Sequence, residues 1–194
     1  ELACRTPFPS RPLGLFGDPD GRRFHEAYFA QHPGVWTHGE FIELTAAGGA
    51  RILGRSDGVL NIRGIRIGPA EIYAALAELP ELAEAMAVGQ EQPGEPGSSR
   101  LVLLVVLRGE RTLDRPLTLR IKKELSQRCS MAHVPAVVAQ VAELPVTHNG
   151  KRSERAARDA LHGRPIANLG ALRNPESLRA ISDHPLLRAE RDSP

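Results

Sequence analysis

The stretch LVLLVVL at Leu101–Leu107 is the longest apolar run in the chain, and the elements around it must be arranged to cover it. A membrane-spanning helix needs about 20 apolar residues, and this run is far shorter. A short, uninterrupted apolar run bounded by turn-forming residues is typical of a buried strand. We therefore expect Leu101–Leu107 to form a buried strand of a globular domain.

The residues before this strand predict a strand pair, a helix and a further strand. GVLNIRGIRIG (58–68) alternates apolar and polar residues around Gly64, as a bent strand pair or hairpin does. PAEIYAALAEL (69–79) begins with a proline suited to the first helical position. Its apolar residues recur at helical spacing and predict one stripe that faces a sheet. LAEAMAVG (82–89) then predicts a strand.

The residues after Leu107 predict a helix, a strand and a last helix. PLTLRIKKELSQRC (116–129) has an apolar residue at every fourth position, and AVVAQVAEL (136–144) is typical of a strand. The last helix begins near Ser153, a plausible N-cap, although Ala156 leaves the capping box incomplete. This order predicts a small α+β domain, in which helices flank a small mixed sheet.

Both ends of the chain differ from this domain. Residues 1–56 predict a loop rich in proline and glycine, a short helix at 22–32 and two short strands around a Gly-Gly turn within 40–54. They contain too few apolar residues to close a core. Residues 163–194 predict an extension that needs another surface to pack on. We expect both ends to be the least well packed parts of an isolated chain.

Composition excludes several classes of function. The chain is 41% hydrophobic and 25% charged, with a net charge of +2 and dispersed basic residues, so we expect no nucleic-acid partner. Cys4 and Cys129 have no partner at ligand spacing, so neither a metal site nor a disulfide framework is expected. No membrane segment or signal peptide is indicated, and a cytoplasmic location is expected. A start at ELACRTPF without an initiator Met suggests a piece of something longer.

The glycine-rich motifs do not predict a nucleotide fold. The chain has no GxGxxG and no GxxxxGK[ST] sequence, so it lacks the Rossmann and Walker A phosphate loops. THGE (37–40) and GRSDG (54–58) each place a carboxylate beside a glycine on a loop. Such a carboxylate accepts both hydroxyls of a ribose, but the same patterns also form ordinary turns. Both interpretations stay open from these motifs alone.

Lys151 is the candidate for meeting negative charge. It lies in ELPVTHNGKRSE (143–154), directly after an Asn-Gly turn in which Gly150 is suited to a positive φ. An ammonium is a compact charge with three donors and suits phosphoryl or acyl-phosphate chemistry. The alternative is a surface lysine after a hairpin turn. The neighbouring His148 has no catalytic partner beside it in sequence and is expected to be exposed.

Three motifs in order carry a family resemblance: THGE (37–40), GRSDGVLNIRGIRIGPAEIY (54–73) and ELPVTHNGK (143–151). Together they resemble the C-terminal part of the acyl-adenylate-forming ligases, and the resemblance covers essentially the whole chain. The flanks and the tail are most similar to the members that join acetoacetate to CoA. These stretches are PFPSRPLG (7–14), AYFAQHPGVWTHGEF (27–41) and GALRNPESL (170–178).

The resemblance implies roles for residues around the nucleotide. Glu40 replaces the family's aspartate that binds the AMP ribose, and Arg55 matches an arginine that also contacts the ribose. Arg66 matches the arginine that meets the nucleotide phosphate during adenylation. Lys151 matches the catalytic lysine, and Asp57 matches the hinge about which a mobile lid rotates.

The resemblance also implies a binding region for CoA. Arg63 and Gly64 match the loop that lines the pantetheine tunnel, and Lys122 is expected near the CoA 3′-phosphate. The family's usual lysine in this loop is replaced by Asn61, so no role is carried over there.

The implied domains are a β-rich remnant of a large AMP-binding domain at 1–56, the mobile lid at 57–162 and an extension at 163–194. The implied substrates are acetoacetate, ATP with Mg²⁺, and CoA. The phosphate loop and the acyl pocket belong to a missing N-terminal domain, so an isolated chain is expected to be inactive. Two alternatives stay open: a non-catalytic lid or interaction module, and a ligase for another short acid such as acetate.

Overall fold

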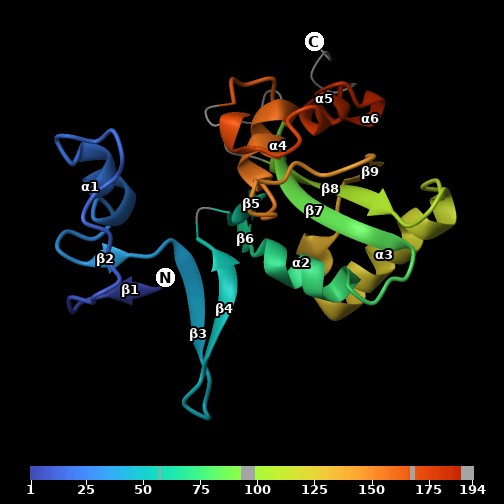
Figure 1. Cartoon of the computed structure of the whole chain (residues 1–194). Helices are drawn as coiled ribbons and strands as arrows, with labels where there is room; N and C mark the ends of the chain where they lie inside the picture. The colour runs from blue at the N-terminus through green and yellow to red at the C-terminus, as the bar shows by residue number, and fades with distance from the viewer. Residues whose placement is uncertain (57, 93–98, 167–168, 189–194) are drawn as a thin grey trace. The chain divides into compact units, whose positions relative to one another are not determined.

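The computed structural model describes residues 1–56, 58–92, 99–166 and 169–188 (Figure 1). Contacts divide the chain into two compact units, Glu1–Asp57 and Gly58–Pro194. Each unit is described by itself. In the part of the chain that the structure describes, no helix is both long and apolar enough to span a bilayer.

A three-stranded sheet forms the middle layer of the second unit. Its strands are β7 (Leu82–Glu91), β8 (Ser99–Leu107) and β9 (Val137–Gln140), in the order β7-β8-β9. β8 is antiparallel to β7 and parallel to β9, so the sheet is mixed as predicted. The prediction of a buried strand at Leu101–Leu107 is confirmed, since all of these residues except the partly exposed Val106 are buried.

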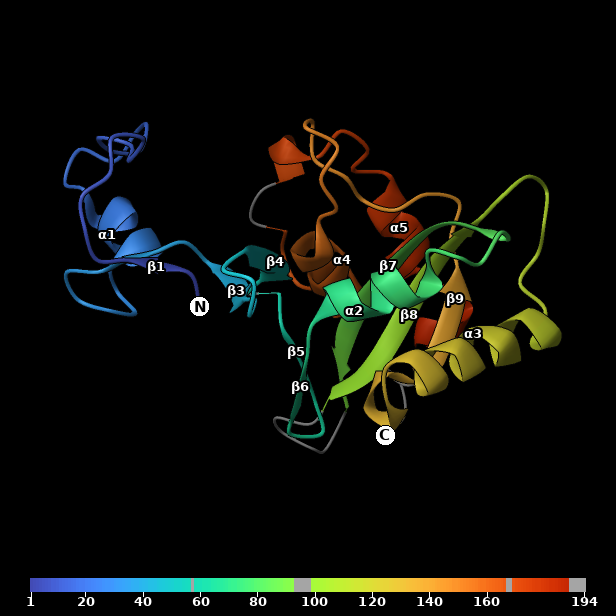
Figure 2. The same cartoon turned by 90° about the horizontal axis from the view of Figure 1, so that it is seen from below.

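One face of the sheet packs against α2 (Pro69–Leu76) and α3 (Arg115–Arg128), which lie below the sheet in Figure 1. The hairpin of β5 (Leu60–Ile62) and β6 (Ile65–Ile67) leads into α2 and adds to the same core (Figure 2). The predicted stripe of the first helix is buried in this core, as are two residues of α3. These side chains are Ile72, Ala75, Leu76, Leu79, Ile121 and Leu125.

The opposite face packs against α4 (Glu154–Leu161), α5 (Ser177–Ser182) and α6 (Pro185–Arg188), drawn above the sheet in Figure 1. Successive β8 residues point to opposite faces, so Leu103 enters the first core and Leu104 enters the second. Because helices cover both faces, β8 is apolar at nearly every position rather than at alternate ones. The predicted α+β class with flanking helices is confirmed.

The packing of the C-terminal segment differs from our prediction. We expected residues 163–194 to be among the least well packed parts of the chain, and for residues 169–188 this is wrong. Four of their apolar side chains lie in the second core, and Gln90 Nε2 on β7 donates a hydrogen bond to Leu187 O at 3.1 Å. The surface that this segment needed is the sheet of the same unit. Its buried apolar residues are Leu172, Leu178, Ile181 and Leu187.

The first unit has little core. Its elements are β1 (Ala3–Cys4), α1 (Arg22–Tyr28), β2 (Trp36–Thr37), β3 (Glu40–Leu44) and β4 (Ala50–Arg55). β1 pairs with β2, and β3 pairs with β4. An aromatic cluster surrounds Trp36, which stacks on Tyr28 at 3.9 Å between ring centroids. Leu13 and Phe16 are fully exposed, in line with the few apolar residues that the sequence offers here.

Tyr73 joins the two helical layers around the edge strand β7. Its hydroxyl accepts a hydrogen bond from the fully buried Ala87 N at 3.1 Å and donates to Glu154 Oε1 on α4 at 3.2 Å. Burial, and then the charge of Glu154, raises the pKa of Tyr73 above its ordinary value, so the hydroxyl keeps its proton. Arg152 lies over the ring, with Cζ 4.6 Å from the centroid.

Replacing Tyr73→Phe is expected to lower the free energy of unfolding by about 1–3 kcal/mol, because the buried Ala87 N–H loses its acceptor. Urea denaturation measures this loss. Tyr28→Phe is the matched control, since among the described residues no hydrogen bond of the Tyr28 hydroxyl is present, and a change within about 0.5 kcal/mol is expected. Equal losses in the two variants would contradict the role given to the Tyr73 hydroxyl.

Candidate functional site

The loop that carries Lys151 is a tight hairpin between β9 and α4. Val146 pairs with Arg152 in an antiparallel bridge, and Thr147 N donates to Lys151 O at 2.8 Å. The Thr147 hydroxyl accepts a hydrogen bond from Lys151 N at 3.2 Å. Gly150 has a φ of 73°, the conformation that the Asn-Gly sequence favours. Backbone bonds on both sides therefore hold Lys151 at the end of the turn.

The Lys151 side chain is exposed while its neighbour is anchored. Among the residues that the structure describes, none accepts a hydrogen bond or forms an ion pair with Lys151 Nζ. Arg152, by contrast, is held over the ring of Tyr73. An ammonium without a protein partner keeps its three donors available for an anionic ligand. The geometry suits a lysine that meets negative charge on a substrate.

The β5–β6 hairpin brings three predicted site residues together. Ile62 pairs with Ile65, so Arg63 and Gly64 form the connection, with φ values of 50° and 82°. Positive φ at both central residues is the geometry of a type I′ turn. Arg66 pairs with Asn61 across the hairpin, and both side chains are exposed. The hairpin therefore presents two arginines and an unobstructed glycine backbone to solvent.

Glu40 and Arg55 are cross-strand partners on β3 and β4 in the first unit. His38 Nε2 lies 3.8 Å from Glu40 Oε2, and His38 Nδ1 accepts a hydrogen bond from Trp36 Nε1 at 3.3 Å. Because an indole N–H only donates, this bond leaves the imidazole proton on Nε2, facing the carboxylate. The sequence motif thus places a histidine in contact with the predicted ribose-binding carboxylate.

The two remaining predicted site residues are Asp57 and Lys122. Asp57, the predicted hinge, lies outside the described residues. Lys122 on α3 donates a hydrogen bond from Nζ to Ala136 O at 3.2 Å, so its ammonium already has a backbone partner. Glu40 and Arg55 belong to one unit, and the other described site residues belong to the second.

Sequence reasoning assigned no role to Thr147 or Tyr73, yet these residues support the Lys151 loop. Thr147 binds both the N–H and the C=O of Lys151, and Tyr73 holds Arg152 beside it. The signal for Thr147 is its place at the start of the Asn-Gly turn, where a hydroxyl bonds local backbone. Nothing in the sequence connects Tyr73 with Arg152, because the two residues meet only across the edge of the sheet.

A second polar cluster is structural. The buried His133, in the 3₁₀ helix at Met131–His133, contacts Ser130 Oγ and Glu71 Oε2, each at 2.9 Å. Ser130 also caps this short helix by accepting from Ala132 N at 3.2 Å. The cluster ties the end of α3 to the start of α2.

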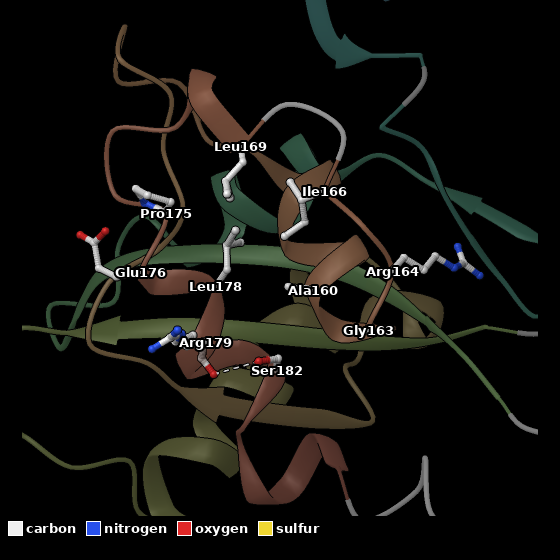
Figure 3. A pocket seen from close by; sticks show the side chains of 10 residues that line it. All are labelled: Ala160, Gly163, Arg164, Ile166, Leu169, Pro175, Glu176, Leu178, Arg179 and Ser182. Atoms are coloured by element: carbon white, nitrogen blue, oxygen red, sulfur yellow. Dashed lines mark hydrogen bonds between the residues drawn. The ribbon is translucent and has the colours of Figure 1, made fainter.

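One cavity lies away from the predicted site. It encloses about 570 Å³ between α4 and α5 and is lined by residues such as Ala160, Leu178 and Arg179 (Figure 3). None of the predicted site residues lines it. Within the described part of the chain, no group of three or more His, Cys, Asp or Glu side chains is placed to hold a metal ion.

Comparison with known proteins gives the same family as the motifs. Residues 71–151 match the profile of the AMP-binding enzyme C-terminal domain. The chain is 45% identical over 178 residues to an acetoacetyl-coenzyme A synthetase of Rhizobium meliloti, covering 92% of this chain and 27% of that protein. It is 34% identical over 189 residues to the acetoacetyl-CoA synthetase of Xenopus tropicalis, covering 97% of this chain and 28% of that protein.

A solved structure agrees with these relatives. The acetoacetyl-CoA synthetase from Streptomyces lividans is similar with a TM-score of 0.84 and 39% identity, covering 96% of this chain and 28% of that one. The chain thus spans 27–28% of the length of these relatives. The resemblance to the C-terminal part of the acyl-adenylate-forming ligases is confirmed, because residues 71–151 match the AMP-binding enzyme C-terminal domain and the relatives match almost the whole chain.

Proposed function

We propose that this chain is the C-terminal part of an acetoacetate–CoA ligase, which activates acetoacetate with ATP and transfers the acyl group from acetoacetyl-AMP to CoA. The observation that carries this proposal is Lys151, whose side chain is exposed and has no partner among the described residues. The two relatives and the solved structure support it, because each is an acetoacetyl-CoA synthetase and each matches 92% or more of the chain.

Lys151 would act in the first half-reaction. As the acetoacetate carboxylate attacks the α-phosphate, negative charge gathers on the oxygens between them, and the ammonium would bridge these oxygens. Such a contact is worth several kcal/mol of barrier, about that of an oxyanion-hole donor. Arg66 would meet the nucleotide phosphate, and Glu40 and Arg55 would meet the ribose. Mg²⁺ would enter bound to ATP as part of the substrate.

The β5–β6 hairpin would act in the second half-reaction. Residues 57–162 would form a lid that turns about Asp57, withdraws Lys151 and presents Arg63 and Gly64 to the pantetheine arm. Apart from its two chain neighbours, no atom of the described residues lies within 4 Å of a Cβ built on Gly64, so this side of the glycine is open to a ligand. A lid that turns lets one active site run two steps with different requirements.

The proposal also covers the two ends of the chain, Lys122 and the two cysteines. Residues 1–56 would complete the large AMP-binding domain, and 163–194 would be the extension. Lys122 would have to release Ala136 O to reach a CoA phosphate. Cys4 and Cys129 are free, which suits a reducing compartment such as the cytoplasm.

Lys151→Ala in the full-length protein is expected to lower acetoacetate-dependent ATP–pyrophosphate exchange by about 100-fold or more, on the scale of a lost oxyanion donor. Thioester formation from supplied acetoacetyl-AMP should stay near the wild-type rate, because the lysine is then withdrawn.

The matched control is Lys123→Ala, an exposed lysine on α3 that should leave both half-reactions unchanged. Equal loss of both half-reactions in Lys151→Ala would refute the assigned role. The 194-residue chain by itself should show no exchange, and robust turnover would contradict its dependence on a further domain.

The acid is tested separately by kcat/KM of the full-length protein for acetoacetate and for acetate. We expect acetoacetate to be preferred by about tenfold or more, since a pocket shaped for the longer acid gains contacts that acetate cannot make. An equal or higher value for acetate would indicate a ligase for another short acid.

A further inference from the structure

Residues 171–173 of the C-terminal segment lie beside residues 146–148 of the Lys151 loop. They occupy the side that residues 151–152 leave open. Thr147 pairs with Leu172 in an antiparallel bridge. His148 N donates to Ala171 O at 3.1 Å, and Arg173 N donates to Val146 O at 2.9 Å. The strand-like residues 146–148 therefore have backbone partners on both sides: 151–152 on one and 171–173 on the other.

Asn174 closes this arrangement with its side chain. Its Oδ1 accepts a hydrogen bond from Val146 N at 2.9 Å, and its Nδ2 donates to Leu144 O at 2.9 Å and to Glu143 Oε2 at 2.7 Å. One partner is only a donor and two are only acceptors, so the orientation of the amide is fixed. Asn174 is 7% exposed. Its side chain thus binds the backbone just before the Lys151 turn, with every amide atom in use.

The support behind Asn174 is rigid. Asn174 O accepts hydrogen bonds from Ser177 N at 3.1 Å and from Ser177 Oγ at 2.7 Å, which joins it to the first turn of α5. α5 and the residues after it pack into the second core through Leu178, Ile181 and Leu187, all 5% exposed or less. Val146 is thereby tied to the second core through Asn174 and α5, in addition to its chain connection to β9.

This support matters because Lys151 itself has few constraints. Among the described residues, the backbone hydrogen bonds of Lys151 go to Thr147, which lies between the two flanking segments. A displacement of about 1 Å at a reacting group is enough to cost about 100-fold in rate. A buried amide that fixes the base of the turn limits such displacement of the ammonium.

We propose that Asn174 is a positioning residue for Lys151, and that the segment 170–178 is the scaffold that holds the lysine loop in place for adenylation. The inference rests on the proposed function of Lys151. Asn174 contacts no substrate in this role and acts only through the backbone at 144–147. The proposal gives a function to the GALRNPESL motif, which the family comparison leaves without one.

The test uses Asn174→Ala in the full-length protein. We expect kcat for adenylation to fall by about 10- to 100-fold, with a much smaller change in KM for ATP, because the lysine is misplaced while nucleotide contacts persist. Thioester formation from supplied acetoacetyl-AMP should stay within about threefold of wild type, since Lys151 does not act in that step. Faster amide hydrogen exchange at Val146 and Thr147 should accompany the change.

Val88→Ala, on β7 and outside the segment 170–178, is the matched control for stability. It opens a cavity in the same core, lowers Tm and leaves the Asn174 hydrogen bonds in place, so both half-reactions should stay near wild type below Tm. If Asn174→Ala does not fold, Asn174→Ser removes the amide that binds Val146 N and keeps a small polar side chain without adding a charge beside Glu143. It should show the same split between half-reactions.

The outcomes separate the two proposals. If Lys151→Ala cripples adenylation but the Asn174 variant behaves like Val88→Ala, the positioning role is wrong and the proposed function stands. If Lys151→Ala leaves adenylation intact, the proposed function fails and this inference fails with it. An equal loss of both half-reactions in the Asn174 variant would show a general structural role and would also overturn the inference.

Discussion

The burial of β8 on both faces is the constraint on which the second unit depends. Leu101–Val105 are each 1% exposed or less, and burying each such side chain contributes about 1.5–3 kcal/mol. Both faces need a helical cover, which α2 and α3 provide on one side and α4, α5 and α6 on the other (Figure 1). Elements from distant parts of the chain therefore pack on the two faces of this strand and form the two cores.

This layering separates the two candidate functional elements. The β5–β6 hairpin packs into the first core through Leu60, Ile62 and Ile67, whereas the Lys151 loop leads into α4, which packs into the second. Tyr73 connects the two layers around the edge of β7 by reaching Glu154 and holding Arg152. Different layers of the second unit therefore support the cationic hairpin and the lysine loop, as the proposed lid with two surfaces requires.

Much of the fold could be predicted because local sequence patterns indicate most of its helices and strands. The hairpin, α2, β7, β8, α3, β9 and α4 occur in the predicted order, and the ends of most differ by only a few residues. The packing of 169–188 could not be predicted in the same way. α5 spans six residues and α6 four, so neither is long enough to show a helical period. Their burial depends on the second face of the sheet, which no local pattern reveals.

The same distinction between local patterns and tertiary contacts applies to the candidate site. By itself the sequence determined the Asn-Gly turn before Lys151, the glycine hairpin at Arg63–Gly64 and the family motifs, because turn geometry follows from the few residues within the turn. Only the tertiary structure decided that Lys122 is bonded to Ala136 O and that Asn174 holds Val146. Those contacts join residues far apart in the chain, and they exist because burying both faces of one apolar strand brings the segments together.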